Sequence, residues 1–201
     1  MFLNKTVFKR LVKAAYNNGR LAVGDIYGGI LIDGKIWRIW CAEGHMPNWA
    51  KAALVELIGE FPGVGQLLEY KKNEVPQILL SENEDLNLPA MYRRAVTPYT
   101  VTQVTYGEKY FKLRFLQDRK TKELAALSEE LYSLIDFSNL EPKENRPAGP
   151  STFDGDRFFW RNEQYVLVLC GMRTTDEKTL EVMSQLGKIV FEEDALWEFQ
   201  S

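Results

Sequence analysis

The chain has 201 residues and a formal net charge of −3 at pH 7, with 45% hydrophobic and 26% charged residues. These values are typical of a globular protein that buries a sizeable core, and they exclude collagen-like, low-complexity and disulfide-stapled chains. Two cysteines and a single histidine exclude sites that need several imidazole or thiolate ligands, so we expect no metal and no cofactor.

The first predicted element is a helix from Lys5 to Asn18. Asn4 is suited to the N-cap position, and Gly19 is suited to the left-handed conformation that ends many helices. Apolar residues recur at helical spacing on one side of this segment, whereas the other side carries basic residues. We therefore predict one core face and one cationic face.

Residues 30–40 predict a β-hairpin. Asp33-Gly34 separates two β-rich runs and favours a type I′ turn with positive φ at both central residues. Pro47 favours the first turn of a second helix, which Pro62-Gly63 is expected to end. The apolar stripe of that helix predicts packing on the sheet.

The pattern after the second helix is weaker, and we predict only a strand at 77–80 followed by an acidic loop. A second hairpin is predicted around Gly107, with arms at 100–105 and 109–116. Leucines at helical spacing then predict a third helix over 120–137.

Proline, glycine and charged residues over 141–152 predict a mobile loop. Several regular elements are expected after it. They are strands at 157–161 and 165–169, a helix that begins at the capping box Thr174–Glu177 and ends at Gly187, and a strand at 189–191.

The predicted fold class is α+β, with antiparallel sheets built from hairpins and packed amphipathic helices. We expect one compact unit over 1–201, or two similar subdomains at about 1–95 and 96–201. A helix, a glycine, a basic residue and a strand occur over 5–23 and again over 176–191, and this repetition suggests the second alternative.

The segment 1–5 lacks the apolar core of a signal peptide, and the longest apolar runs, such as 165–172, are far shorter than the roughly 20 residues of a membrane span. We therefore expect a cytoplasmic protein that has no membrane partner. Cys41 and Cys170 lie in strand-like apolar stretches and are expected to be reduced and buried.

The charge is distributed unevenly along the chain. Residues 1–20 contain five basic residues and no acidic residue, whereas residues 176–201 contain seven acids and two lysines. A cationic helical face of this kind can contact phosphates, although a face that only keeps the protein hydrated has the same pattern. The candidate nucleic-acid-binding residues are Lys5, Lys9, Arg10, Lys13 and Arg20.

Two predicted strands mix basic and aromatic residues. Alternation places Trp37 on one face of its strand and Arg38 and Trp40 on the other, and Phe159 and Trp160 are divided in the same way. Either both faces of the sheet are covered, or one face binds a protein partner, a second copy of the chain or single-stranded bases. These five residues are the candidate partner-binding residues.

Cys41 and His45 are a thiol and an imidazole close together in the sequence. A catalytic thiol needs a base within hydrogen-bond reach and an electropositive environment, and the sequence shows neither. The alternative is a buried strand cysteine beside a polar residue near a helix start. No other residues suggest a catalytic site.

Two stretches resemble DNA sliding clamps of the bacterial polymerase III beta type. They are the helix with Gly19, the strand from Leu21 to Asp25 and the hairpin through Trp40, and later the apolar segment 164–173 that ends in Met172-Arg173. The resemblance implies helices packed on an outer antiparallel sheet, basic helices that face DNA and no catalytic residue. It also implies that Lys5, Lys9, Arg10 and Lys13 contact phosphates.

Three functions are therefore considered. The first is a non-enzymatic, clamp-like binding protein that contacts nucleic acid or an acidic partner through its basic N-terminal helix. The second is a protein-interaction or assembly module that uses the aromatic strand surfaces. The third, a hydrolase or transferase, depends on Cys41 and His45 alone.

Overall fold

The structure is a computed structural model that describes residues 1–79, 84–108, 111–140 and 145–191. The helices are α1 (Lys5–Asn17), α2 (Asn48–Ile58), α3 (Leu88–Arg94), α4 (Glu129–Tyr132) and α5 (Glu177–Leu186). The strands are β1 (Leu21–Asp25), β2 (Gly29–Asp33), β3 (Trp37–Ala42), β4 (Leu67–Tyr70), β5 (Gln77–Leu79), β6 (Thr97–Glu108), β7 (Phe111–Asp118), β8 (Leu124–Ser128), β9 (Ala148–Thr152), β10 (Arg157–Arg161) and β11 (Tyr165–Cys170).

The strands form one antiparallel sheet in the order β5-β4-β1-β2-β3-β11-β10-β9-β6-β7-β8. The predicted α+β class is therefore confirmed. The sheet joins the first and second halves of the chain, because β11 pairs with β3 from Trp37↔Leu169 to Cys41↔Tyr165. β6 belongs to two parts of the sheet, since its start pairs with β9 and its remainder pairs with β7.

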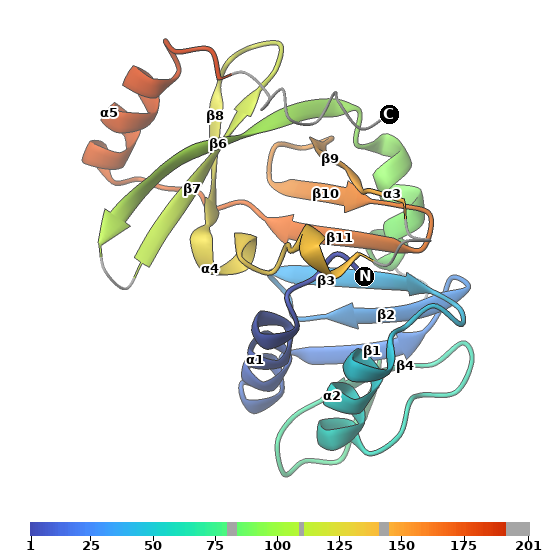
Figure 1. Ribbon diagram of the computed structural model, residues 1–201. Helices are drawn as coiled ribbons and strands as arrows, with labels where there is room; N and C mark the ends of the chain where they lie inside the picture. Colours follow the sequence, from blue (N-terminus) through green and yellow to red (C-terminus); the bar gives the residue numbers. More distant parts are fainter. Residues whose placement is uncertain (80–83, 109–110, 141–144, 192–201) are drawn as a thin grey trace.

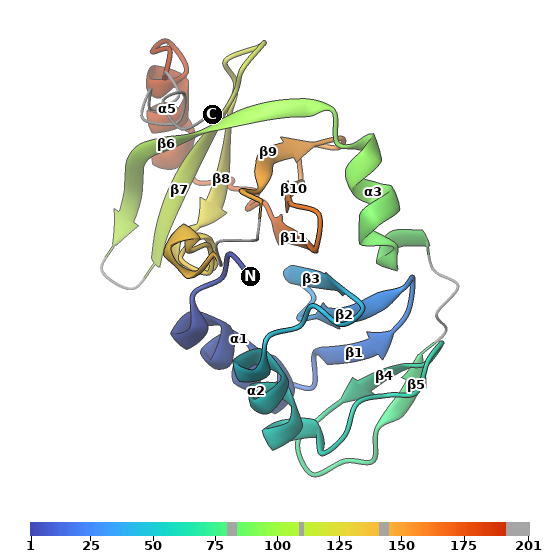
Figure 2. The ribbon, with the colours of Figure 1, turned by 45° about the vertical axis from the view of Figure 1, so that its right-hand side comes forward.

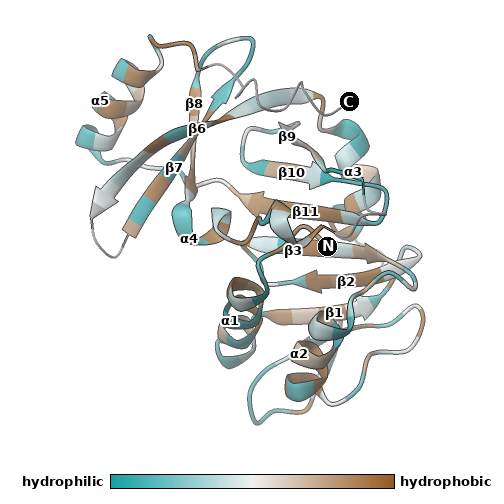
Figure 3. Ribbon diagram, viewed as in Figure 1, coloured by the Kyte–Doolittle hydropathy of each residue, from teal (hydrophilic) through white to brown (hydrophobic). Residues whose placement is uncertain are grey.

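Helices cover both faces of the central strands. α1 and α2 lie on one face, and α3 lies on the other (Figures 1 and 2). Alternate residues of each strand therefore enter different cores: Ile39 and Leu167 pack toward α1, whereas Leu31 and Val166 pack toward α3. The central strands are accordingly apolar along most of their length (Figure 3). α5 packs separately against β7 and β8.

Helix α1 forms as predicted. The side-chain oxygen of Asn4 accepts hydrogen bonds from the backbone N–H groups of Thr6 and Val7, both at 3.1 Å. Its buried residues recur at helical spacing and pack on the sheet, and they are Phe8, Leu11, Val12 and Ala15. Gly19 follows the helix with a φ of +62°, a conformation that glycine adopts without steric cost.

The hairpin of β2 and β3 is confirmed, but its turn is not the predicted type I′. Among the turn residues, the positive φ belongs to Lys35, whose N–H donates to the Asp33 carboxylate at 2.6 Å. Gly34 is required for a different reason. A Cβ at Gly34 would lie 2.3 Å from the ring of Trp37, so the indole packs directly on the glycine backbone.

The prediction of a helix over 120–137 is wrong. Asp118 accepts hydrogen bonds from the N–H groups of Lys120 and Thr121 and closes a tight turn. Lys122 has a positive φ, and the chain returns as β8 along β7 before the short helix α4. The leucines suit a buried strand as well as a helix, so this turn decided the outcome.

Several other boundaries differ from the predictions. α2 ends at Gly59, which has a φ of +82°, rather than at Pro62-Gly63. The segment 141–152, expected to be a loop, contains β9, and residues 141–144 lie outside the described part. α5 is capped by Asp176, not Thr174.

The helix α3 and the strand β4 were not predicted, whereas strands β10 and β11 form as expected. The strand predicted at 189–191 is absent from the described part of the sheet. Instead, the side-chain amide of Gln117 donates to the carbonyl of Ile189 at 2.8 Å and accepts from the N–H of Phe191 at 2.9 Å. The segment 189–191 is therefore bound to the sheet by the side chain of Gln117 and not by backbone pairing with a strand.

Asn4→Ala should lower the free energy of unfolding by about 1 kcal/mol, because two N–H groups at the start of α1 lose their acceptor. Urea denaturation measures the change. Asn17→Ala, an exposed substitution at the other end of α1, is the matched control and should change the stability by less than about 0.5 kcal/mol. An equal loss in both variants would contradict the capping role.

Candidate nucleic-acid interface

The outer face of α1 carries a stripe of lysines. Lys5, Lys9 and Lys13 are exposed, and none of them forms a salt bridge with any residue that the structure describes. They are spaced four residues apart, so at 1.5 Å per residue the stripe is about 12 Å long. Arg10 is also exposed and forms a 3.3 Å salt bridge with Glu130. The structure thus brings four of the predicted cations to one surface.

These charges do not stabilise the helix that carries them. Two pairs of like-charged residues are neighbours at i,i+4 in this stripe, Lys5 with Lys9 and Lys9 with Lys13. Each such pair destabilises a helix by roughly 0.2–0.5 kcal/mol. Lys5 also lies in the first turn, where the helix dipole disfavours a cation. No acidic residue occurs in α1 to compensate. The cationic stripe therefore requires an explanation other than helix stability.

The inner side of α1 packs against α2. The rings of Phe8 and Trp49 meet edge to face, with centroids 5.2 Å apart. The Nζ atom of Lys5 lies 6.0 Å from the centre of the Trp49 ring, at the outer limit of a cation–π contact. The lysine stripe is consequently presented on a packed helix pair.

Three further basic residues lie at the C-terminal end of α1. Arg20 is exposed, as are Lys71 and Lys72 in the segment after β4. The backbone N–H of Lys72 donates to the carbonyl of Tyr16 at 3.3 Å, and the side chain of Lys71 lies over Gly19. The sequence shows two adjacent lysines, but only the β1–β4 pairing brings them to α1.

The candidate partner-binding aromatic residues are interior. Trp37 and Trp160 are buried in the core under α1 and α2, and Trp40 and Phe159 are buried under α3. Arg38 is held within the molecule, because it pairs with Asp33 at 3.1 Å and donates to the carbonyl of Asp85. Of the two alternatives from the sequence, the covering of both sheet faces is the one observed.

Cys41 and His45 do not form an accessible nucleophile and base. Cys41 has no exposed surface, whereas His45 is exposed and its backbone carbonyl accepts a 2.7 Å hydrogen bond from the hydroxyl of Tyr165. Both cysteines are free thiols, and burial raises the pKa of Cys170. The arrangement offers no support for thiol catalysis.

The described residues contain no group of three or more histidine, cysteine, aspartate or glutamate side chains that could hold a metal ion. Likewise, none of the helices in the described ranges combines the length and apolar character needed to cross a membrane.

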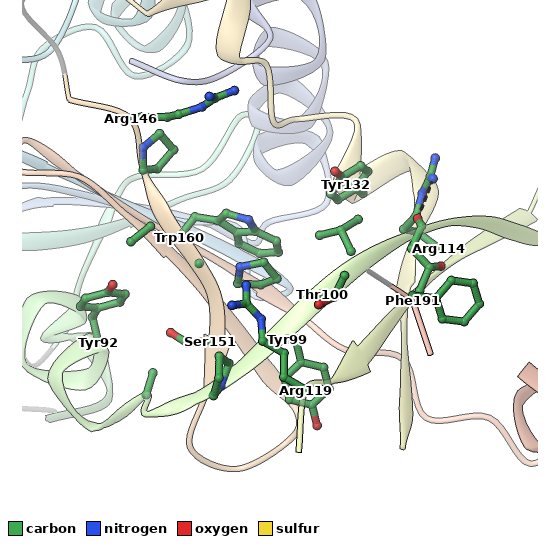
Figure 4. A pocket seen from close by; sticks show the side chains of 18 of the residues that line it. Tyr92, Tyr99, Thr100, Arg114, Arg119, Tyr132, Arg146, Ser151, Trp160 and Phe191 are labelled. Atoms are coloured by element: carbon green, nitrogen blue, oxygen red, sulfur yellow. Dashed lines mark hydrogen bonds between the residues drawn. The ribbon is translucent and has the colours of Figure 1, made fainter. Parts of the chain in front are cut away.

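The sequence did not predict a cavity of about 870 Å³ between β6 and β9 (Figure 4). Its lining includes Tyr99 from β6, Ser151 from β9, and three arginines, Arg114, Arg119 and Arg146. The sequence shows no motif there, because these residues come from two separate segments, 99–119 and 146–151. A local charge pattern could not have revealed them.

No protein-family model matches the chain, and none of the curated proteins matches it. A search of solved structures found the beta subunit from DNA polymerase of Streptococcus pyogenes, with 8% sequence identity and a TM-score of 0.31. The match covers 94% of this chain and 67% of that chain. The similarity is a weak one of overall fold and supports no statement about binding.

Lys9→Glu should raise the free energy of unfolding by about 1 kcal/mol at low salt, because it converts two repulsive i,i+4 pairs into attractive ones. Denaturant titrations at low and high salt measure this gain, which should shrink as salt screens the charges. The control is Lys51→Glu on α2. The i−4 and i+4 neighbours of Lys51, residues 47 and 55, are uncharged, so this substitution changes no i,i+4 charge pair. A loss of stability in Lys9→Glu would show that Lys9 has a structural role.

Proposed function

We propose that this protein is a non-enzymatic binding protein that contacts the phosphate backbone of nucleic acid through the outer face of α1. The observation that carries the proposal is the stripe of Lys5, Lys9 and Lys13, which is exposed, unpaired among the described residues and unfavourable for the helix itself. A binding role accounts for that unfavourable charge.

The physical basis is the release of counterions. Each phosphate that a lysine or arginine neutralises frees condensed cations, so affinity rises steeply as the salt concentration falls. Such contacts position a protein on nucleic acid without reading its sequence. Arg10 can contribute a fourth contact when its solvent-exposed pair with Glu130 opens, because exposed pairs contribute little stability.

Nucleic acid is favoured over an acidic protein surface because the stripe is regular. Successive lysines rise about 6 Å along the axis of a rigid helix and have the same sign throughout. A polymer with evenly repeated negative charges can contact all of these lysines at once. Two more exposed basic residues, Arg20 and Lys72, lie at the C-terminal end of the helix.

The triple variant Lys9→Glu, Arg10→Glu and Lys13→Glu should abolish salt-sensitive binding to a fluorescent duplex. Fluorescence anisotropy at about 50 mM and about 200 mM salt measures the binding. The matched control reverses three exposed lysines that lie outside α1, Lys120, Lys178 and Lys188, and so changes the net charge equally. The control should bind more tightly than the α1 variant.

Single substitutions sharpen the test. Lys9→Ala should reduce the slope of log affinity against log salt by about 1, because one phosphate contact is lost. If the unaltered protein does not bind the duplex at low salt, the proposal is wrong. Equal affinity for polyglutamate and for DNA would instead indicate a general acidic partner and contradict the choice of nucleic acid.

A further inference from the structure

The face of the sheet opposite α1 also carries basic side chains, around the C-terminal end of α3. Figure 2 shows α3 on the other side of the central strands from α1. Arg93 and Arg94 are the last two residues of α3, and Arg161 is the last residue of β10. The guanidinium of Arg94 lies 4.9 Å from the centre of the Phe153 ring, and that of Arg161 lies 5.3 Å from the centre of the Tyr92 ring. We call Arg93, Arg94 and Arg161 the α3 arginines.

Helical geometry places these three side chains on neighbouring positions. Successive residues of an α-helix lie about 100° apart around its axis. Arg93 therefore lies between Tyr92, whose ring carries Arg161, and Arg94. The opposite side of the helix buries Met91 in the core. Arg93 and Arg94 are exposed and Arg161 is half-buried, so the α3 arginines form an arc on the outer side of the helix end.

The α3 arginines form no salt bridge with any residue that the structure describes. Arg157 provides a comparison, because its guanidinium also lies 4.9 Å from the centre of the Phe153 ring. Arg157 pairs with Asp154 at 2.7 Å and with Asp85 at 3.3 Å, so its charge is compensated inside the protein. Arg94, at the same ring, has no acidic partner within the described residues. The α3 arginines thus keep N–H donors available for an external anion.

Helix stability explains only part of this arrangement. The helix dipole favours cations in the last turn, which accounts for Arg93 and Arg94. It does not account for Arg161, which belongs to β10 and lies on the same strand face as the buried Phe159. The ring contacts hold two of the guanidiniums in place before a ligand binds, so less side-chain freedom is lost on binding. Their flat, forked N–H groups match the oxygens of a phosphate.

We propose that the α3 arginines are a second phosphate-contacting surface, so that one protein molecule binds two segments of nucleic acid, one on each face of its sheet. The inference rests on the function proposed for α1. It favours nucleic acid as the partner because a polymer held at α1 raises the local concentration of phosphates at the second surface. With three cations, the α3 surface should bind more weakly than α1.

The stiffness of DNA makes this inference testable. The persistence length of a duplex is about 150 base pairs, so a duplex of about 15 base pairs cannot bend around the sheet to contact both faces. Two such duplexes, one with a donor dye and one with an acceptor dye, are mixed with the full-length protein at about 50 mM salt and about 10 μM of each component. We expect energy transfer between the two duplexes that depends on the protein and is lost at about 200 mM salt.

The decisive variant combines Arg93→Ala, Arg94→Ala and Arg161→Ala. It should lower the energy transfer roughly fivefold or more, because the second duplex loses its phosphate contacts. It should still bind a single duplex in fluorescence anisotropy, since α1 is unchanged, and that binding also shows that the variant is folded. Arg93→Glu alone provides a second test, because this exposed side chain touches neither ring, and it should lower the energy transfer roughly threefold.

A matched control removes three exposed lysines that lie outside both surfaces and changes the net charge equally. Its substitutions are Lys120→Ala, Lys178→Ala and Lys188→Ala. The control should give nearly the energy transfer of the unaltered protein. An equal loss in the control and in the α3 variant would show that only net charge matters and would overturn the inference.

The outcomes separate this inference from the function proposed for α1. Binding of one duplex without energy transfer, or energy transfer that the α3 substitutions leave unchanged, would overturn the second surface and leave the α1 proposal intact. Failure of the unaltered protein to bind any duplex in anisotropy would contradict the α1 proposal itself. Polyglutamate that suppresses the energy transfer at a lower charge concentration than unlabelled duplex does would assign the α3 arginines to an acidic protein and would also overturn the inference.

Discussion

The pairing of β11 with β3 is the interaction on which the rest of the structure depends. It joins strands from opposite ends of the chain, in register from Trp37↔Leu169 to Cys41↔Tyr165. Because helices cover both faces, these strands bury side chains on both sides, and the hydrophobic gain is about twice that of a sheet with one wet face. The positions of α1, α3 and β6 all follow from this central ladder.

The central sheet determines the positions of both the lysine stripe of α1 and the cavity beside β6, in different ways. α1 places its apolar stripe on the sheet, so its lysines must face outward, and the β1–β4 pairing adds Lys72 at the helix end. The cavity arises at the opposite edge of the central strands, where β6 leaves β9. One is an exposed, lysine-rich helix face, and the other is a partly open cavity lined by arginine and aromatic side chains.

Sequence patterns succeeded where one local signal was sufficient. The Asn4 cap, the Asp33-Gly34 dipeptide and the Asp176 region mark elements that the structure contains, although the hairpin turn is not type I′ and some boundaries shift. They failed where two signals competed. The leucines after Lys122 fit a helix, yet the Asp118 turn and the neighbouring β7 made them a strand, because tertiary pairing outweighs propensity.

The sequence by itself determined that α1 is amphipathic with an outer face free of acids, since a helix orients its residues by spacing alone. Only the tertiary structure decided that Trp37 and Trp160 are core residues, because a strand cannot indicate which of its faces another element will cover. It also decided the meeting of Arg119, Arg146 and Ser151 around one cavity. Arg119 follows β7, whereas Arg146 and Ser151 lie at β9, and the pairing of β6 with β7 and with β9 brought the two segments together.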